Sequence, residues 1–593
     1  MKSIREYEET YSNLSSEWIK ENANVPRSYS AFVDYVFKNE VVTRRQLLEY
    51  FDAHEVKAHL EGDLHIHKLP QSLWNPYCTG WDYGLILKKG IVGTVPSAKP
   101  AKYLSTAVAH LVHFFLILCQ EWTGAQAVTG VDLYLAPFVN KDKLDFNRVR
   151  KEIETLVFDL NYPYRRDFQS PFTNITLVMD QIEYFNQKPA IIAGRELDDQ
   201  LSDFMDECII LNKAFIDVFM EGDGLSRPFT FPILTIPITK KFDWNERRWD
   251  DLTYRIFELI SRRGSIYIFN GVKYNAEEVF SMCCRLLLNR TVRGIWSIPD
   301  NIGSINCVTI NLPRIGMISN DEDKFFEVLD QKLELARSIL MKLRKRYEEI
   351  MRNGSMMILT QNYLECGLSN HFNTIGVVGL PEAASILMNN LDVWTECKDR
   401  DIRDAIEIMK RILIFINERL KEFSKADGYK YNLEEVPAES TAYRFAKLDE
   451  EKYPLFRHYI PYYNNYPLYS NSIIPYSADL SLIERIKYES EVQKFFTGGV
   501  ILHIFLNSLA DVEALKKLTY RIVHQTDLVY FSFTPVISVC PKCKRSFTAH
   551  LERCPECGGS VEVWSRIVGY YRPINRWLPA RVSEFKARTH YSI

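Results

Sequence analysis

Helical spacing of apolar and charged residues dominates several parts of this chain. In the first 60 residues it is clearest in residues 17–24 and 30–37, which predict surface helices. Residues 323–351 and 401–423 carry a long amphipathic pattern rich in Lys, Arg and Glu, and a solvated face is the simplest interpretation of their charges. Long helices are therefore expected in both halves of the chain.

A strongly apolar stretch from Tyr103 to Val139 predicts a long apolar helix. Its most apolar part, Ala107 to Cys119, is too short to span a bilayer and contains two histidines. We therefore expect a buried helix and no membrane segment.

Short β-prone runs lie between the helical stretches, at residues 171–176 and 229–239. Residues 306–315 show a strand pattern that ends in a turn. Strands that alternate with helical crossovers are typical of the α/β class.

Composition narrows the class of protein. The 593 residues are 46% hydrophobic and 13% aromatic, which is ample for a substantial core. The net charge is −3, so the chain lacks the excess of basic residues that is typical of nucleic-acid-binding proteins. The N-terminal residues are too charged for a signal peptide, so a cytoplasmic protein is expected.

Four cysteines near the C-terminus form two Cys-x-x-Cys pairs, Cys540 with Cys543 and Cys554 with Cys557, separated by ten residues. Each tight knuckle directs two sulfurs toward one point, which suits tetrahedral zinc. Two disulfides or a redox motif are the alternatives. Zinc is favoured over both because a chain without a signal peptide keeps its thiols reduced.

A loop around one glycine follows these cysteines: residues 565–577 include Gly569, and Glu584 and Arg588 come shortly after it. This segment resembles the glycyl-radical loop of anaerobic (class III) ribonucleotide reductases, in which a site of four cysteines lies just upstream. The resemblance implies that Gly569 stores the radical. A glycine has no side chain to block hydrogen abstraction at Cα, although by itself Gly569 is equally compatible with an ordinary turn.

The resemblance continues through nearly the whole chain. Further matching segments, in order, are residues 21–24, 62–67, 77–82, 281–286, 306–315, 371–379, 437–440, 469–475 and 498–499. It implies that Cys284 forms a thiyl radical and that Cys78 donates hydrogen from the opposite side of the sugar. It also implies that the Asn311 amide positions the ribose hydroxyls without adding charge.

Departures from the family pattern are few. Lys68 stands where the family usually has aspartate, and Leu578-Pro579 follows Trp577 unexpectedly. The pair His65 and His67 has metal-binding spacing, but alternating residues on a strand are more often divided between packing and hydrogen bonding. There is no room for the N-terminal ATP-cone of many members, so an ATP switch of that type is not expected.

The implied architecture is a ten-stranded α/β barrel of the glycyl radical enzyme and ribonucleotide reductase type. In it a cysteine-bearing finger loop and the glycine loop meet at the centre. We divide the chain into an N-terminal helical segment (1–60), the catalytic barrel (61–530), a zinc-binding ribbon (531–562) and the glycyl radical loop with the tail (563–593).

The implied activity is oxygen-sensitive reduction of ribonucleoside triphosphates to 2′-deoxyribonucleoside triphosphates for DNA synthesis. By the same resemblance, a separate S-adenosylmethionine-dependent iron–sulfur activase makes the radical, and nucleotide effectors bind a homodimer. The reductant is formate or a thioredoxin- or glutaredoxin-type dithiol, and Cys366 is an extra thiol without an assigned role.

Two other classes compete with this interpretation. A pyruvate formate-lyase-like acyl transferase also uses adjacent cysteines such as Cys283 and Cys284, but the cysteines before Gly569 resemble the reductase pattern. A zinc-ribbon protein that binds nucleic acid is favoured only by the four cysteines, and the absence of a basic bias argues against it.

Overall fold

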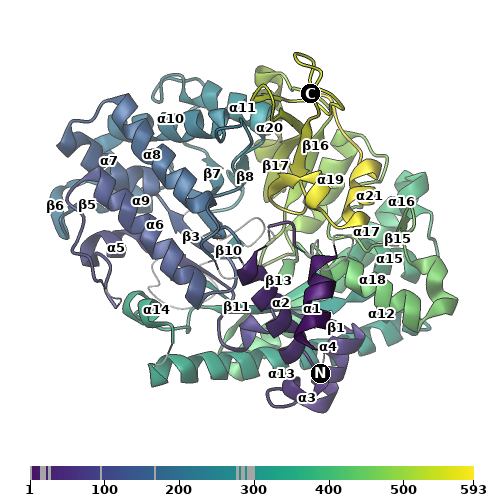
Figure 1. Cartoon of the computed structure of the whole chain (residues 1–593). Coiled ribbons are helices and arrows are strands. Elements are labelled where there is room, and N and C mark those ends of the chain that lie inside the picture. The colour runs from purple at the N-terminus through teal and green to yellow at the C-terminus, as the bar shows by residue number, and fades with distance from the viewer. Residues whose placement is uncertain are drawn as a thin grey trace.

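The computed structural model describes residues 3–13, 22–24, 28–93, 96–165, 168–275, 279–281, 287–289, 301–354 and 356–593. Strands occupy the centre and helices surround them (Figure 1). The central sheet follows the order β13-β12-β11-β2-β3-β4-β7-β8-β17-β16, and β1 (Leu64–Ile66) pairs with β11 beside this path. These strands are β2 (Cys78–Trp81), β3 (Gln126–Thr129), β4 (Thr173–Thr176), β7 (Ile233–Thr239), β8 (Ile266–Gly271), β11 (Gly303–Asn311), β12 (Phe372–Val378), β13 (Lys430–Glu435), β16 (Leu502–Leu506) and β17 (Tyr530–Pro535).

The two ends of this path meet and close a barrel. The amide of Gly498, just before β16, donates to the carbonyl of Leu433 in β13 at 2.7 Å, and Glu435 donates to Gly499 at 2.9 Å. Ten strands therefore form a ring, and the predicted ten-stranded barrel is confirmed.

The ring consists of two parallel halves. Strands β2, β3, β4, β7 and β8 run parallel to one another. Parallel pairing also joins β11 to β12, β12 to β13 and β16 to β17, whereas the junctions β11–β2 and β17–β8 are antiparallel. Every residue of β7 and β11 is buried, as expected for strands covered on both faces.

Helices α6 (Leu104–Glu121) and α7 (Val131–Asp142) replace the single long helix predicted from Tyr103 to Val139. Strand β3 separates them and pairs with β2. Just before β3, the chain passes close to β2 at Gly124, where a Cβ would lie 2.4 Å from the sulfur of Cys78. In the described part of the chain, α6 alone has the length and apolar character of a membrane span. More than half of it is buried against neighbours that include α7 and α8 (Phe146–Asn161), so the predicted buried helix is confirmed.

Both long amphipathic helices are present, as α13 (Glu322–Asn353) and α17 (Asp399–Asp427). Their charged residues are only partly a solvated face, because some of them join the two helices. Arg337 of α13 contacts Asp427 at 2.7 Å, and Arg419 of α17 contacts Glu334 at 2.7 Å. The remaining described helices of eight or more residues are α1 (Ile4–Ser12), α2 (Tyr29–Val41), α4 (Ala53–Glu61), α10 (Met205–Glu221), α11 (Leu252–Arg263), α15 (Leu380–Leu387), α18 (Thr441–Lys452), α19 (Leu482–Gln493), α20 (Val512–Gln525) and α21 (Pro579–Ala587).

The end of β11 continues into helix α12 (Leu312–Ile318), where the sequence predicted a turn. Asn311 is the N-cap of this helix, since its side-chain oxygen accepts from the amide of Arg314 at 3.3 Å. Pro313 lies in the first turn, where its missing N–H costs no hydrogen bond.

The C-terminal ribbon is a four-stranded sheet, β19-β18-β20-β21. Its strands are β18 (Ile537–Cys540), β19 (Arg545–Phe547), β20 (Glu562–Arg566) and β21 (Tyr571–Pro573). Residues 567–570, which include Gly569, connect β20 to β21. The cysteine knuckles and the glycine loop thus share one sheet, which crosses the boundary that the sequence suggested at residue 562. Pro579 begins α21, which accounts for Leu578-Pro579.

Candidate functional site

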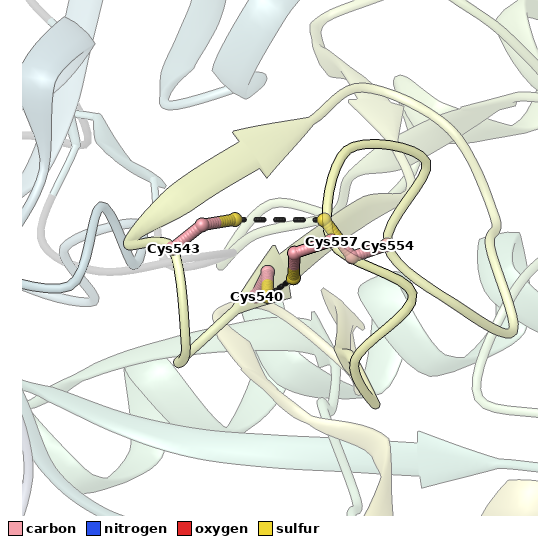
Figure 2. Close-up of side chains that lie close together, drawn as sticks. All are labelled: Cys540, Cys543, Cys554 and Cys557. Carbon is pink, nitrogen blue, oxygen red and sulfur yellow. Dashed lines mark hydrogen bonds between the residues drawn. The ribbon is translucent and has the colours of Figure 1, made fainter.

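The four cysteines of the ribbon form one cluster (Figure 2). Their sulfur atoms all lie within 4.8 Å of one another. The Cys540–Cys557 and Cys543–Cys554 sulfurs are 3.5 Å apart, far longer than a disulfide bond. Four converging thiols fit a structural zinc ion.

A cavity of about 780 Å³ brings the glycine loop and Cys78 together. Val568 and Tyr570, the two neighbours of Gly569, line it, and so does Cys78. Other walls come from β1, from α2, from the end of α6 and from residues 436–441. Residues more than 400 positions apart therefore enclose one space of substrate size.

Cys78 is held firmly on the wall of this cavity. It is the first residue of β2 and is 1% exposed. Its sulfur accepts a hydrogen bond from the amide of Ala125 at 3.1 Å. Gly124 leaves room for the thiol, because any larger residue there would collide with it. A fixed, enclosed thiol of this kind suits hydrogen donation to a bound substrate.

The glycine loop is buried and its backbone is fixed by side chains from distant elements. Arg588, which follows α21, donates to the carbonyls of Arg566 at 2.8 Å and Ile567 at 3.0 Å. Tyr570 donates to Glu439 at 2.6 Å, which ties the loop to the segment between β13 and α18. Glu439 and Arg588, which both lie in segments that resemble the family, thus hold the glycine loop in position.

The predicted thiyl residue Cys284 and its neighbour Cys283 lie outside the described residues. Two short strands on either side of them, β9 (Val279–Ser281) and β10 (Leu287–Asn289), pair antiparallel.

Asn311 is not among the described residues that line the cavity. Its side-chain nitrogen donates to the carbonyl of Gly62 at 3.1 Å and to Asp449 at 2.9 Å, while its oxygen caps α12. All of these bonds are internal to the protein and buried. Asn311 therefore has a structural role as a helix cap, and the ribose contact that the resemblance implies for it stays a prediction.

Three histidines, His59, His65 and His67, line the cavity, with ring centroids 5.3 Å and 4.8 Å apart along the series. Removal from water lowers the pKa of all three, and that of His67 to about 3, so the rings are neutral. His67 bonds the hydroxyl of Thr309 at 2.7 Å, and His59 accepts from the amide of Ile66 at 3.2 Å. These bonds favour the structural interpretation of the histidine pair.

Positive charge gathers at the cavity, which the sequence did not predict. Among its described lining residues, Lys38, Lys68, Arg165 and Arg444 are cationic, against the acidic Asp34 and Glu439. Burial raises the pKa of Glu439. These cations come from four separate segments of the chain. Of the four, the sequence singled out only Lys68, as a departure from the family pattern.

An α/β barrel with a substrate-sized cavity between a strand cysteine and a C-terminal glycine loop is typical of an enzyme. A family model of anaerobic ribonucleoside-triphosphate reductases matches residues 21–591, and the chain therefore belongs to that family. It is an oxidoreductase that reduces ribonucleoside triphosphates to their 2′-deoxy forms. Neither the acyl transferase nor the nucleic-acid-binding alternative is favoured.

Individual relatives agree with this assignment. The anaerobic ribonucleoside-triphosphate reductase of Escherichia coli K12 is 25% identical over 581 residues, covering 88% of this chain and 76% of the relative. That of Enterobacteria phage T4 is 21% identical, covering 82% and 81%. The Thermotoga maritima anaerobic ribonucleotide reductase, solved with dATP in its specificity site, has the same fold, with a TM-score of 0.75 at 23% identity over 96% of this chain and 93% of that one.

Proposed function

We propose that Gly569 stores the radical of this reductase and passes it to Cys284, which abstracts the 3′ hydrogen of the ribose. A radical at C3′ allows the neighbouring 2′-hydroxyl to leave as water. Cys78 then donates a hydrogen atom during reduction, and Cys284 returns the 3′ hydrogen. The net two electrons come from an external reductant, and the zinc ion has a structural role only.

The observation that carries this proposal is the shared cavity. Cys78 and both neighbours of Gly569 line one cavity of about 780 Å³. The main contribution of such a site to radical chemistry is to position the reacting groups. The direct test is anaerobic conversion of a ribonucleoside triphosphate by the activated chain, and failure to form any deoxynucleotide would contradict it.

Replacing Cys78 with serine is expected to separate radical storage from reduction. The glycyl radical should still form, because Gly569 is untouched, but deoxynucleotide formation should be lost. An O–H bond is too strong for serine to donate a hydrogen atom to a carbon radical. Electron paramagnetic resonance and product chromatography on the same sample measure the two steps.

A matched control for this variant is Cys397→Ser. Cys397 is half-buried and is not among the described cavity-lining residues. It should keep both the radical and the turnover. If Cys78→Ser reduces nucleotides at the wild-type rate, Cys78 is not the hydrogen donor.

We infer that the cationic residues of the cavity, Lys38, Lys68, Arg165 and Arg444, bind the triphosphate of the substrate. Lys68 is the informative residue, because its backbone has φ 58°, in the left-handed region that costs most side chains roughly 1–2 kcal/mol. Asn and Asp tolerate this conformation better, so Lys68→Asn removes the charge without adding backbone strain.

We expect Lys68→Asn to raise KM for the triphosphate about tenfold, the effect of losing roughly 1.4 kcal/mol of charge-assisted hydrogen bonding. The value of kcat should change little. Lys68→Arg, which keeps the charge, should behave like the wild type. An unchanged KM in Lys68→Asn would place the triphosphate elsewhere in the cavity.

The partners proposed for this chain are the S-adenosylmethionine-dependent activase, nucleotide effectors and a second copy of the chain, in the cytoplasm. Formate and a thioredoxin-type dithiol are the two candidate reductants. Assaying turnover with each one alone would identify the reductant. Equal turnover without either would contradict both.

A further inference from the structure

The two carbonyl groups on either side of the Gly569 Cα both accept hydrogen bonds from buried side chains. His503 Nε2 lies 3.1 Å from the carbonyl oxygen of Val568. The phenol of Tyr267 donates to the carbonyl oxygen of Gly569 itself. Tyr267 and His503 are each 2% exposed, so water does not compete for these bonds. These are the two carbonyls over which an unpaired electron at this Cα is delocalised.

The bond from Tyr267 to the Gly569 carbonyl leads back to a buried cation, Arg566. Its Nε atom donates to the phenol oxygen of Tyr267 at 3.0 Å. An arginine has no acceptor, so the phenol oxygen accepts from it and the phenol O–H points to Gly569. The guanidinium also lies over the Tyr267 ring, 4.4 Å from its centroid. Arg566 therefore polarises the donor that holds the Gly569 carbonyl.

The bond between His503 and the Val568 carbonyl also leads back to Arg566, through Ser532. Arg566 Nη1 donates to the hydroxyl oxygen of Ser532 at 3.0 Å, and that hydroxyl lies 2.8 Å from His503 Nδ1. The Val568 carbonyl can only accept, so His503 carries a proton on Nε2 and donates it to this carbonyl. Nδ1 can then accept from the Ser532 hydroxyl.

Arg566 is itself fixed, because it is 1% exposed and its other hydrogen bonds go to neutral oxygens. These acceptors are the carbonyl of Phe533 at 3.1 Å, the hydroxyl of Thr534 at 2.6 Å and the carbonyl of Gly264. Arg566 thus lies three residues before Gly569, at the end of β20. Two arms of hydrogen bonds run from it to the carbonyls beside the Gly569 Cα, one through Tyr267 and one through His503.

We propose that Arg566, Tyr267 and His503 form a two-armed hydrogen-bond relay that sets the stability of the radical on Gly569. The inference rests on the proposed role of Gly569. The Tyr267 arm draws electron density into the carbonyl of the radical residue, and the His503 arm fixes the orientation of the preceding peptide. Neither residue reacts; both are positioning residues.

Tyr267→Phe tests the first arm with the smallest possible change. The chain is activated anaerobically with an S-adenosylmethionine-dependent iron–sulfur activase, and the doublet is followed by electron paramagnetic resonance. We expect the radical yield per chain, relative to wild type, to fall about fivefold, the effect of one lost hydrogen bond. The α-hydrogen splitting should also change, because it reports the spin density at Cα. A variant that only loosened the fold would lower the yield without moving the splitting.

His503→Leu and His503→Gln form a matched pair for the second arm. Leucine removes the donor, whereas the amide nitrogen of glutamine takes the place of Nε2. We expect a lower radical yield in His503→Leu and recovery of most of it in His503→Gln. Zinc content and thermal unfolding, measured on each variant, identify any that has lost the ribbon or the fold.

The possible outcomes distinguish the assignment of the radical to Gly569 from the proposed hydrogen-bond relay. A wild-type chain that gives no doublet while the activase cleaves S-adenosylmethionine would overturn both the Gly569 assignment and the relay. A wild-type doublet with unchanged yield, lifetime and splitting in Tyr267→Phe would overturn the relay alone. If Tyr267→Phe does not fold, equal radical yields in His503→Leu and His503→Gln would overturn it.

Discussion

Gly569→Ala will abolish both the glycyl radical and nucleotide reduction. An α-carbon radical is most stable when it is planar and conjugated with both flanking amides, and a methyl group on Cα crowds the adjacent carbonyls in that geometry. The loop has no freedom to relieve this crowding, because side chains bond its carbonyls and it is buried. Electron paramagnetic resonance after anaerobic activation should show no doublet, and product chromatography should show complete loss of turnover.

The control for this variant must show that the fold survives. Gly354→Ala is suitable, because a Cβ at Gly354 meets nothing within 4 Å and this position ends α13, far from the glycine loop in sequence. Its positive φ costs some stability but leaves the site unchanged. Zinc content should equal that of the wild type in both variants. A normal doublet in Gly569→Ala would move the radical to another residue.

Loss of the zinc ion has the second largest expected effect. Cys543→Ser should reduce bound zinc from about one ion per chain to nearly none, because a structural site depends on all four thiolates. Structural zinc contributes roughly 10–16 kcal/mol of apparent binding free energy, so the knuckles cannot keep their geometry without it. Strands β18 and β20 would no longer hold the glycine loop, and the radical doublet should be absent.

The barrel itself should survive the loss of zinc. Its strands close through β13 and β16 without any contribution from the knuckles, so Cys543→Ser should remain soluble and folded by circular dichroism. Cys366→Ser is the matched control, since this exposed cysteine lies outside the ribbon. It should retain zinc and the doublet. A full-size doublet in zinc-free Cys543→Ser would show that the ion does not position the loop.

Several elements were predictable because their signals are local. Helices α13 and α17 follow from amphipathic periodicity over many turns, and the zinc ligands lie within two short knuckles. The apolar stretch after Tyr103 gave the helix α6 correctly, but not the strand that follows it. That strand pairs with β2, and Gly124 just before it packs against Cys78, which is 46 positions away in the sequence.

Asn311 shows where sequence reasoning cannot decide. A polar amide after a buried strand is compatible with a substrate contact and with a helix cap. Its cap bond to the amide of Arg314 is local, but Asp449 and Gly62, which accept from its side-chain nitrogen, lie far from it in the sequence.

The sequence by itself determined the family, the barrel class and the four-cysteine cluster, because ordered motifs and short cysteine spacings are properties of contiguous residues. The tertiary structure alone decided which charges face the cavity and which donors hold the glycine loop. Lys38, Arg165 and Arg444 converge from separate segments, as do Tyr267 and His503 around Gly569. Hydrogen bonds and charge act through space, and no local pattern records which distant residues the folded barrel brings within their reach.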